Sequence, residues 1–210
     1  MEKQNKKSML IQKYATQYKV VCIGHFPNFG TTEKCEFCSK KLEKAFYYFQ
    51  CTKGNETPVT FYTGPECAKA LASACKITTL PPLSSPFMDE NGARNRAQSE
   101  AASAIAQKTL LGINKQFLNA LIYFVMFKKS KPSNYIANMI CKTREYGTTH
   151  AAFPKQITDL SKFIAEDFKG HTLTDMLTAL AKQYPGNRLK NFDFGLLRQE
   201  CEAQNVQSFY

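Results

Sequence analysis

Six of the eight cysteines lie within residues 18–80, and two of them form the C-x2-C pair Cys35 and Cys38. Two thiolates at this spacing can turn around one ion while the amides between them point toward the sulfurs, which suits tetrahedral zinc. A C-x2-C pair alone is only moderately specific, because two thiols can also share a turn by chance. The residues that follow the pair therefore decide how it is interpreted.

Two strands and a helix are expected after the cysteine pair. Residues 45–51 and 58–63 have the composition of strands, and the segment between them contains a turn signal at Gly54. Gly64 breaks the second strand, and a helix begins near Cys67. Because a hairpin folds back to where it started, we expect Cys67 to arrive beside the pair. A metal ion and the positive end of the helix would both favour its thiolate form.

This stretch resembles the treble-clef zinc modules common in phage and mobile-element proteins. In those modules a C-x2-C-[GS]-K motif is followed by a hairpin and by a helix that starts Gly-x-x-Cys-Ala-x-x-Leu. The matching residues are Cys35, Cys38, Ser39, Lys40, Gly64, Cys67, Ala68 and Leu71. The resemblance covers about residues 20–75 and implies a structural Zn²⁺ held by Cys35, Cys38 and Cys67.

The fourth zinc ligand is left open by the sequence. Treble-clef sites often place a second helix ligand three or four residues after the first, but Ala70 and Leu71 stand there. His25 is the leading candidate, because it follows a glycine at which the chain can bend and its imidazole is a good zinc donor. Cys22 lies in the same expected strand. Cys51 is disfavoured, because at strand rise it stands roughly 20 Å from the cysteine pair.

Composition divides the chain into parts and predicts an α+β protein. A proline-rich stretch separates the cysteine-rich segment from a region in which apolar side chains recur every three or four residues. We expect a small treble-clef domain, a β-hairpin plus a helix, followed by an all-α bundle of about five helices. The predicted parts are a basic segment at 1–19, the zinc domain at 20–80, a linker at 81–93 and the helical domain at 94–210.

The predicted helices follow apolar stripes and their end signals. The first lies within 94–129, carries Phe117 in its stripe and ends before Pro132. Thr172 and Asp175 have the spacing of a capping box at the start of a later helix. The other helices are expected from Ser133 or Asn134 to near Gly147, from about Ile157 to Gly170, and from Asn191 or Asp193 onward.

Charge favours an anionic partner. Lysine and arginine outnumber aspartate and glutamate by 28 to 17, a formal net charge of +11, which points to nucleic acid before a membrane surface. Lysines contact phosphates, and exposed aromatic rings can stack on bases. The candidate nucleic-acid-binding residues are Lys40, Lys41, Lys44, Tyr48, Tyr62, Lys128, Lys129 and Lys131.

These residues also have ordinary structural explanations. Side chains alternate along a strand, so about half of the hairpin aromatics must face the core. Lysines near the end of a helix, such as Lys128, offset its macrodipole. The sequence alone does not choose between these explanations and a binding surface.

Enzyme motifs are missing around the cysteines. The ββα-metal nucleases, which also use a treble clef, need a histidine on the hairpin, and residues 37–76 contain none. The H-x-E and P-C-x-x-C pairs of zinc deaminases are missing, as are H-E-x-x-H and a glycine-rich phosphate loop. We therefore expect binding rather than catalysis, and no small-molecule substrate is evident.

The sequence predicts a cytoplasmic protein, or one of the host cytoplasm if a phage encodes it. The first 20 residues lack the apolar stretch of a secretory signal. The longest apolar run, residues 121–127, is far short of the roughly 20 residues that cross a bilayer. Membranes are therefore not expected as partners, and the thiols are expected to stay reduced.

The sequence thus favours a zinc-stabilised nucleic-acid-binding accessory or regulatory protein of phage or mobile-element type. The first alternative is a protein-interaction adaptor in which zinc is purely structural and the helical domain holds a protein partner. The second alternative is a nuclease whose active site carries no recognised motif. Salt dependence of binding separates the first interpretation from the adaptor, and metal-dependent cleavage identifies the nuclease.

Overall fold

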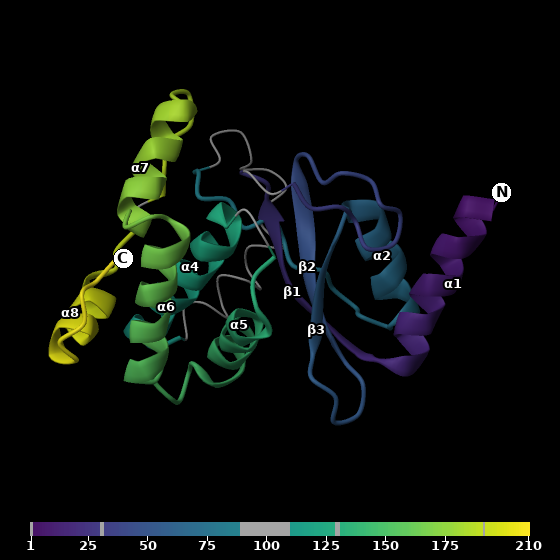
Figure 1. Cartoon of the computed structure of the whole chain (residues 1–210), viewed down its shortest axis with the longest axis horizontal. Coiled ribbons are helices and arrows are strands. Elements are labelled where there is room, and N and C mark those ends of the chain that lie inside the picture. The colour runs from purple at the N-terminus through teal and green to yellow at the C-terminus, as the bar shows by residue number, and fades with distance from the viewer. Residues whose placement is uncertain (1, 30–31, 89–109, 129–130, 191) are drawn as a thin grey trace. The chain divides into compact units, whose positions relative to one another are not determined.

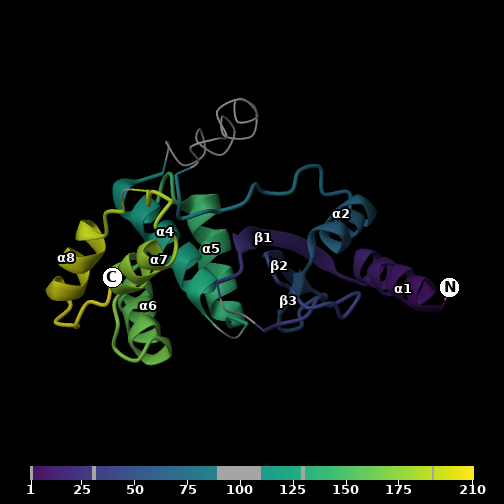
Figure 2. The same ribbon diagram turned by 90° about the horizontal axis from the view of Figure 1, so that it is seen from above.

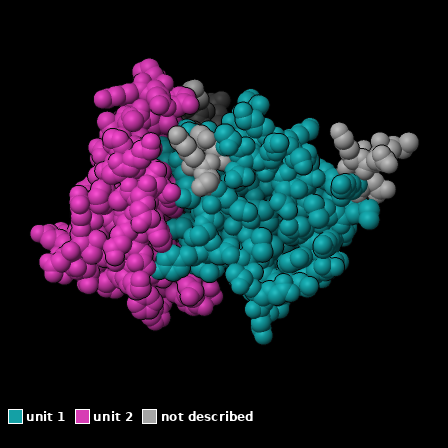
Figure 3. Space-filling view, in the orientation of Figure 1, with its two compact units in different colours: residues 1–84, 125–138 teal, residues 85–124, 139–210 magenta. Residues whose placement is uncertain are grey.

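A computed structural model of the protein describes residues 2–29, 32–88, 110–128, 131–190 and 192–210 (Figure 1). Within these ranges the chain is α+β, with one three-stranded antiparallel sheet and seven helices. None of the described helices combines the length and the apolar character that crossing a bilayer requires. The chain divides into two compact units, coloured separately in Figure 3. Unit 1 comprises residues 1–84 and 125–138, and unit 2 comprises residues 85–124 and 139–210.

The sheet of unit 1 contains the predicted hairpin and the strand beside it. Its strands are β1 (Lys19–Pro27), β2 (Ala45–Thr52) and β3 (Val59–Thr63), in the order β1-β2-β3. Tyr47 pairs with Thr63, so the end of β3 lies beside the start of β2. This register is what returns the chain to the cysteine pair.

Aromatic side chains fill the core of unit 1. Phe49 and Phe61 are directly opposite each other on β2 and β3, and their rings stack with centroids 5.6 Å apart. Phe26 and Phe46 are also fully buried and face each other across β1 and β2. Such cross-strand aromatic pairs stabilise a small sheet beyond the area that they bury.

A helix that the sequence analysis did not predict covers this core. The segment expected only as a basic N-terminal stretch forms α1 (Glu2–Gln17). Ile11 of α1 is buried, and the Tyr14 ring makes edge contacts with Phe37 and Phe61. Figure 2 shows α1 beside α2 (Pro65–Ala74), the helix that follows the hairpin.

Unit 1 is completed by a segment that the sequence analysis placed in the helical domain. Residues 125–138 supply the end of α4 (Gly112–Phe127) and the start of α5 (Asn134–Tyr146). The Tyr48 hydroxyl donates to the Pro132 carbonyl at 3.2 Å, and Gln50 Nε2 donates to Asn138 Oδ1 at 2.9 Å. The predicted linker at 81–93 stays a prediction, because residues 89–93 lie outside the described residues.

Unit 2 contains the remaining turns of these two helices and three further helices. The further helices are α6 (Pro154–Asp167), α7 (Leu173–Gln183) and α8 (Gly195–Ala203). They lie where the apolar stripes placed them, and Thr172 caps α7 as predicted, with Thr172 Oγ1 accepting from the Asp175 amide at 3.0 Å. Residues 94–109 of the predicted first helix lie outside the described residues.

The core of unit 2 joins distant helices around buried apolar side chains. Phe117 is fully buried, as its place in the predicted stripe requires, and the Phe124 ring contacts Phe168. Tyr210 is also buried, and its hydroxyl donates to the Ile157 carbonyl of α6. Unit 2 is therefore held by apolar packing and by hydrogen bonds that close its helix ends.

Candidate metal centre

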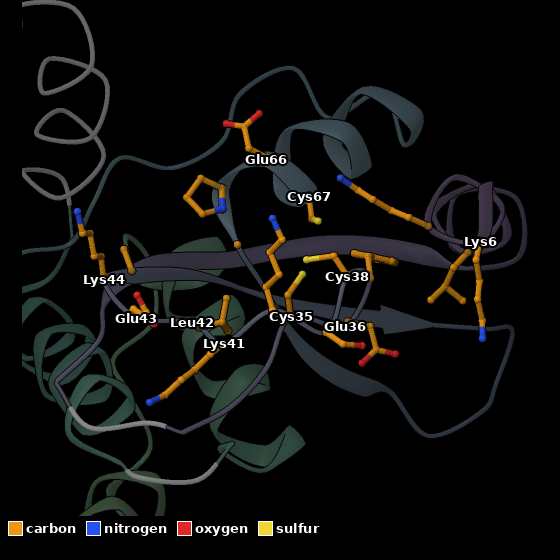
Figure 4. A pocket seen from close by; sticks show the side chains of 18 residues that line it. Lys6, Cys35, Glu36, Cys38, Lys41, Leu42, Glu43, Lys44, Glu66 and Cys67 are labelled. Carbon is orange, nitrogen blue, oxygen red and sulfur yellow. The ribbon is translucent and has the colours of Figure 1, made fainter. Parts of the chain in front are cut away.

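Three cysteines converge in unit 1. The sulfur atoms of Cys35, Cys38 and Cys67 all lie within 4.8 Å of one another. Cys35 and Cys67 are buried and Cys38 is half-buried. Figure 4 shows the three sulfurs turned toward one another. The three residues that the sequence singled out are therefore brought together by the fold.

The cysteine pair sits in a tight turn that backbone hydrogen bonds hold in place. The Cys35 amide donates to the Lys40 carbonyl at 2.9 Å, and the Ser39 amide donates to the Cys35 carbonyl at 2.9 Å. Ser39 has a φ of 55°, in the left-handed region, so the chain reverses just after Cys38. The Glu36 amide donates to the Tyr62 carbonyl at 2.9 Å and ties this turn to β3.

The third cysteine comes from the tip of α2. Gly64 occupies the N-cap position in extended backbone, and Pro65 begins the helix. Cys67 thus lies in the first turn, where amide groups without helical acceptors make the helix end positive. This field favours a thiolate at Cys67.

Electrostatics within the cluster discourage three thiolates in the absence of a cation. Burial opposes ionisation of Cys38, but the Lys40 amide, the two neighbouring thiols and the charge of Lys7 together lower its pKa. Burial and then the charge of Cys35 raise the pKa of Cys67 to about 12. Ionisation is therefore favoured at Cys38 and opposed at Cys67. A divalent cation would remove this opposition, because it compensates all three charges at once.

The candidate fourth ligands do not join the three sulfurs. His25 pairs with Tyr47 across the sheet, and the two rings stack with centroids 3.9 Å apart. Cys22 Sγ points toward the Gly24 carbonyl at 3.9 Å, and Cys51 is buried opposite Val59. None of the three belongs to the group of ligand atoms that lie within 4.8 Å of one another. In the part of the chain that the structure describes, no fourth histidine, cysteine or carboxylate completes the cluster.

His25 nevertheless has an unusual environment. Burial lowers its pKa to about 4, so the ring is neutral at physiological pH. Its Nε2 atom is buried and has no hydrogen-bond partner among the described residues. The neutral form suits a half-buried ring that stacks on Tyr47, and nothing in this geometry requires a metal.

A pocket of about 880 Å³ opens beside the three cysteines. Its walls come from α1, from the turn and the segment after it, and from the start of α2. Figure 4 shows Lys6 on one side of the sulfurs and Lys41 and Lys44 on the other. The charged residues that line the pocket are Lys6, Lys7, Lys40, Lys41, Lys44, Glu36, Glu43 and Glu66.

The predicted nucleic-acid-binding residues near the cysteines differ in exposure. Lys40, Lys41 and Lys44 are exposed and line this pocket, as described above. Tyr48 and Tyr62 are 0% and 3% exposed, so neither ring can stack on a base in this fold. The two tyrosines pair across one face of the hairpin, and Phe49 and Phe61 are buried on the opposite face, so the hairpin is covered on both sides at these positions.

The second predicted basic group is only partly described. Lys131 is exposed and Lys128 is half-buried, whereas Lys129 lies outside the described residues. Sequence reasoning missed Lys6 and Lys7 of α1. The available signal was helical spacing, because Ile11 and Tyr14 follow Lys7 by four and seven residues and share its face.

Comparisons of the chain with protein-family models, with curated proteins and with solved structures found no match. The functional argument therefore rests on the site itself. Three convergent thiols suit a soft or borderline divalent cation such as Zn²⁺.

Proposed function

We propose that Cys35, Cys38 and Cys67 bind one structural Zn²⁺ in a treble-clef module. The convergence of the three sulfurs within 4.8 Å supports this proposal most directly. The order of elements, a turn with two cysteines, a hairpin and a helix tip with the third, is that of a treble clef. Zinc in such sites takes four ligands, so a further donor from solvent or from elsewhere completes the shell.

We further propose that the protein acts by binding nucleic acid, as an accessory or regulatory protein of phage or mobile-element type in the cytoplasm. The net charge of +11 and the lysines around the pocket support an anionic partner. The resemblance of residues 20–75 to phage and mobile-element modules supports the origin. In this proposal α4 to α8 form the helical bundle, and zinc gives the sheet and turn a fixed shape.

Two measurements on one preparation test the proposal. Protein purified without chelators should contain one equivalent of zinc by mass spectrometry of the metal. It should also bind labelled DNA or RNA with an affinity that falls steeply with salt, because released counterions drive such binding. Absence of stoichiometric metal would remove the zinc site.

The alternatives have their own outcomes in the same experiments. Salt-insensitive capture of one protein, with no binding of nucleic acid, would favour the adaptor. Metal-dependent cleavage of a plasmid would favour the nuclease. Cleavage should be compared between wild type and Cys38→Ser, so that activity of a contaminating nuclease is recognised.

A further inference from the structure

Lysines from two distant segments of the chain line one pocket beside the three cysteines. Lys6 and Lys7 come from α1, and Lys40, Lys41 and Lys44 follow the cysteine turn. Among the described residues none of these five ammonium groups lies within ion-pair distance of a carboxylate. These five lysines outnumber the three glutamates of the same lining, so the pocket face has an excess of positive charge that suits an anion.

The carboxylates of the same pocket are in part already engaged. Glu36 accepts a hydrogen bond from the Tyr14 hydroxyl at 3.0 Å. Glu66 forms an ion pair with Lys69, which does not line the pocket, at 3.4 Å. The ion pair compensates Glu66, whereas Glu36 and Glu43 keep their negative charges, so the five lysines still predominate on the pocket walls.

Aromatic packing of α1 against the sheet places Lys7 beside the pocket. The Tyr14 ring meets Phe37 and Phe61 with centroids 5.4 Å and 5.0 Å away, and Phe37 lies within the cysteine turn. Lys7 lies two helical turns before Tyr14 on the same face of α1. Docking of Tyr14 therefore carries Lys7 toward the turn, where its charge acts on Cys38.

The two hairpin tyrosines that were predicted to stack on bases do not complement these charges. The two tyrosines that could have stacked on bases, Tyr48 and Tyr62, are buried. Base-stacking proteins for single strands combine a basic groove with exposed rings, and the rings are what make contact with the bases. Here the charges are present without those two rings, so the contacts would be with phosphates.

We propose that the pocket face is a phosphodiester-binding surface, built jointly by Lys6 and Lys7 of α1 and by Lys40, Lys41 and Lys44 after the cysteine turn. This inference rests on the proposed nucleic-acid function and assigns it a place. The surface holds the sugar-phosphate backbone and does not read the bases. The position of the turn lysines depends on the proposed metal, and the position of the α1 lysines depends on the packing of Tyr14.

Paired substitutions test this surface. We compare Lys6→Gln/Lys7→Gln and Lys41→Gln/Lys44→Gln with the control Lys13→Gln/Lys19→Gln. The control removes the same charge from exposed lysines of unit 1 that do not line the pocket. The probes are labelled oligo(dT) of about 20 nucleotides and a duplex of similar length, with fluorescence anisotropy measured from about 50 to 200 mM salt.

Each pocket pair should weaken binding. It should also make the slope of the logarithm of the association constant against the logarithm of the salt concentration less negative by about 1.4 for the single strand, as expected for two lost phosphate contacts. The control pair should leave the slope near that of wild type. Zinc content and circular dichroism, measured on every variant, should be unchanged, so that a lost slope is not lost folding. Oligo(dT) and mixed-sequence strands should bind alike.

The opposing outcomes separate the two proposals. If wild type binds the probes but the pocket pairs behave like the control, this surface is wrong and nucleic-acid binding stands. If wild type binds neither probe, both proposals fall. Polyglutamate is added as a competitor at the same concentration of charge as an unlabelled oligonucleotide. If the two compete equally well, the partner of this surface is an acidic polypeptide and the nucleic-acid assignment is wrong.

Discussion

The two units of this protein reach stability by different routes. Unit 2 buries aliphatic and aromatic side chains between helices, and it closes their ends with backbone and side-chain contacts such as the Thr172 cap. Unit 1 buries an aromatic core around its three-stranded sheet, and beside it three thiols converge between a turn and a helix tip, where a bound metal would add to the packing. A bound metal would therefore add most to stability where a short turn must be held against a helix tip.

Loss of the proposed zinc should distinguish the two units most clearly. Cys67→Ser, or treatment with a chelator, should abolish stoichiometric zinc and unfold the turn and hairpin, because the binding energy of such a site is folding energy. Amide hydrogen exchange should lose protection in residues 45–63 and keep it in residues 154–183. These segments are β2 to β3 in unit 1 and α6 to α7 in unit 2.

Cys141→Ser is the matched control for that experiment. Cys141 is a half-buried thiol of α5 in unit 2, outside the three-sulfur cluster. The variant should retain zinc and the exchange pattern of wild type. Unchanged protection of the hairpin in Cys67→Ser would show that unit 1 folds without the proposed metal, and the contrast between the units would be wrong.

Phe117→Ala should have the opposite pattern, with unit 2 destabilised and the metal site of unit 1 unaffected. Phe117 is fully buried in unit 2, and truncating it should lower the free energy of unfolding by about 3–5 kcal/mol. Chemical denaturation measures this loss, and zinc content should not change. Phe153→Ala is the control, because that ring is 69% exposed and its loss should stay within about 0.5 kcal/mol.

Acid should affect unit 1 through His25. Burial lowers its pKa in the folded protein to about 4, whereas an exposed histidine titrates near 6.5. As the pH falls from 6.5 to 4 the unfolded chain takes up a proton that the folded chain refuses. Stability is therefore lost across this window. The half-exposed ring limits the loss to about 1–2 kcal/mol.

His25→Phe isolates this effect from acid release of the metal. Phenylalanine keeps a ring to stack on Tyr47 and cannot titrate. The difference in unfolding free energy between variant and wild type should grow in favour of the variant as the pH falls toward 4. A difference that does not change with pH would mean that the histidine ring titrates normally.

The helix cap of unit 2 should give the smallest effect. Thr172→Ala removes the side-chain oxygen that accepts from the Asp175 amide and should cost about 1 kcal/mol. Thermal unfolding would show a small decrease for unit 2 and none for unit 1. Thr172→Ser keeps the hydroxyl and should recover most of the stability, whereas an equal loss in both variants would assign the effect to packing.

Local sequence signals predicted much of this fold. The spacing of Cys35, Cys38 and Cys67 together with the hairpin between them predicted that the sulfurs converge. Apolar periodicity and end signals located α4 to α8 in the described ranges. Each of these signals is contained in a short window of the chain, and this is why it was readable.

What sequence reasoning missed depends on long-range packing. The stripe of α1 is short and broken by lysines, so only its contact with the sheet identifies it as a docked helix. Alternation along the strands suggested one exposed face for the hairpin, but both faces are covered, so Tyr48 and Tyr62 are buried as fully as Phe49 and Phe61. The membership of residues 125–138 in unit 1 likewise has no local signal.

Because unit 1 is made of two separate stretches of the chain, it cannot complete its packing until the second stretch has been synthesised. Tyr48 donates its hydroxyl hydrogen to a carbonyl 84 residues later in the chain. At ordinary translation rates of roughly 5–20 residues per second, the nascent sheet waits roughly 4–17 s for that acceptor to be polymerised. During this interval the buried hydroxyl and the Gln50 amide lack their native partners. A ribosome-bound chain stalled before residue 132 should therefore be digested by protease more readily than one stalled after residue 138 has left the exit tunnel.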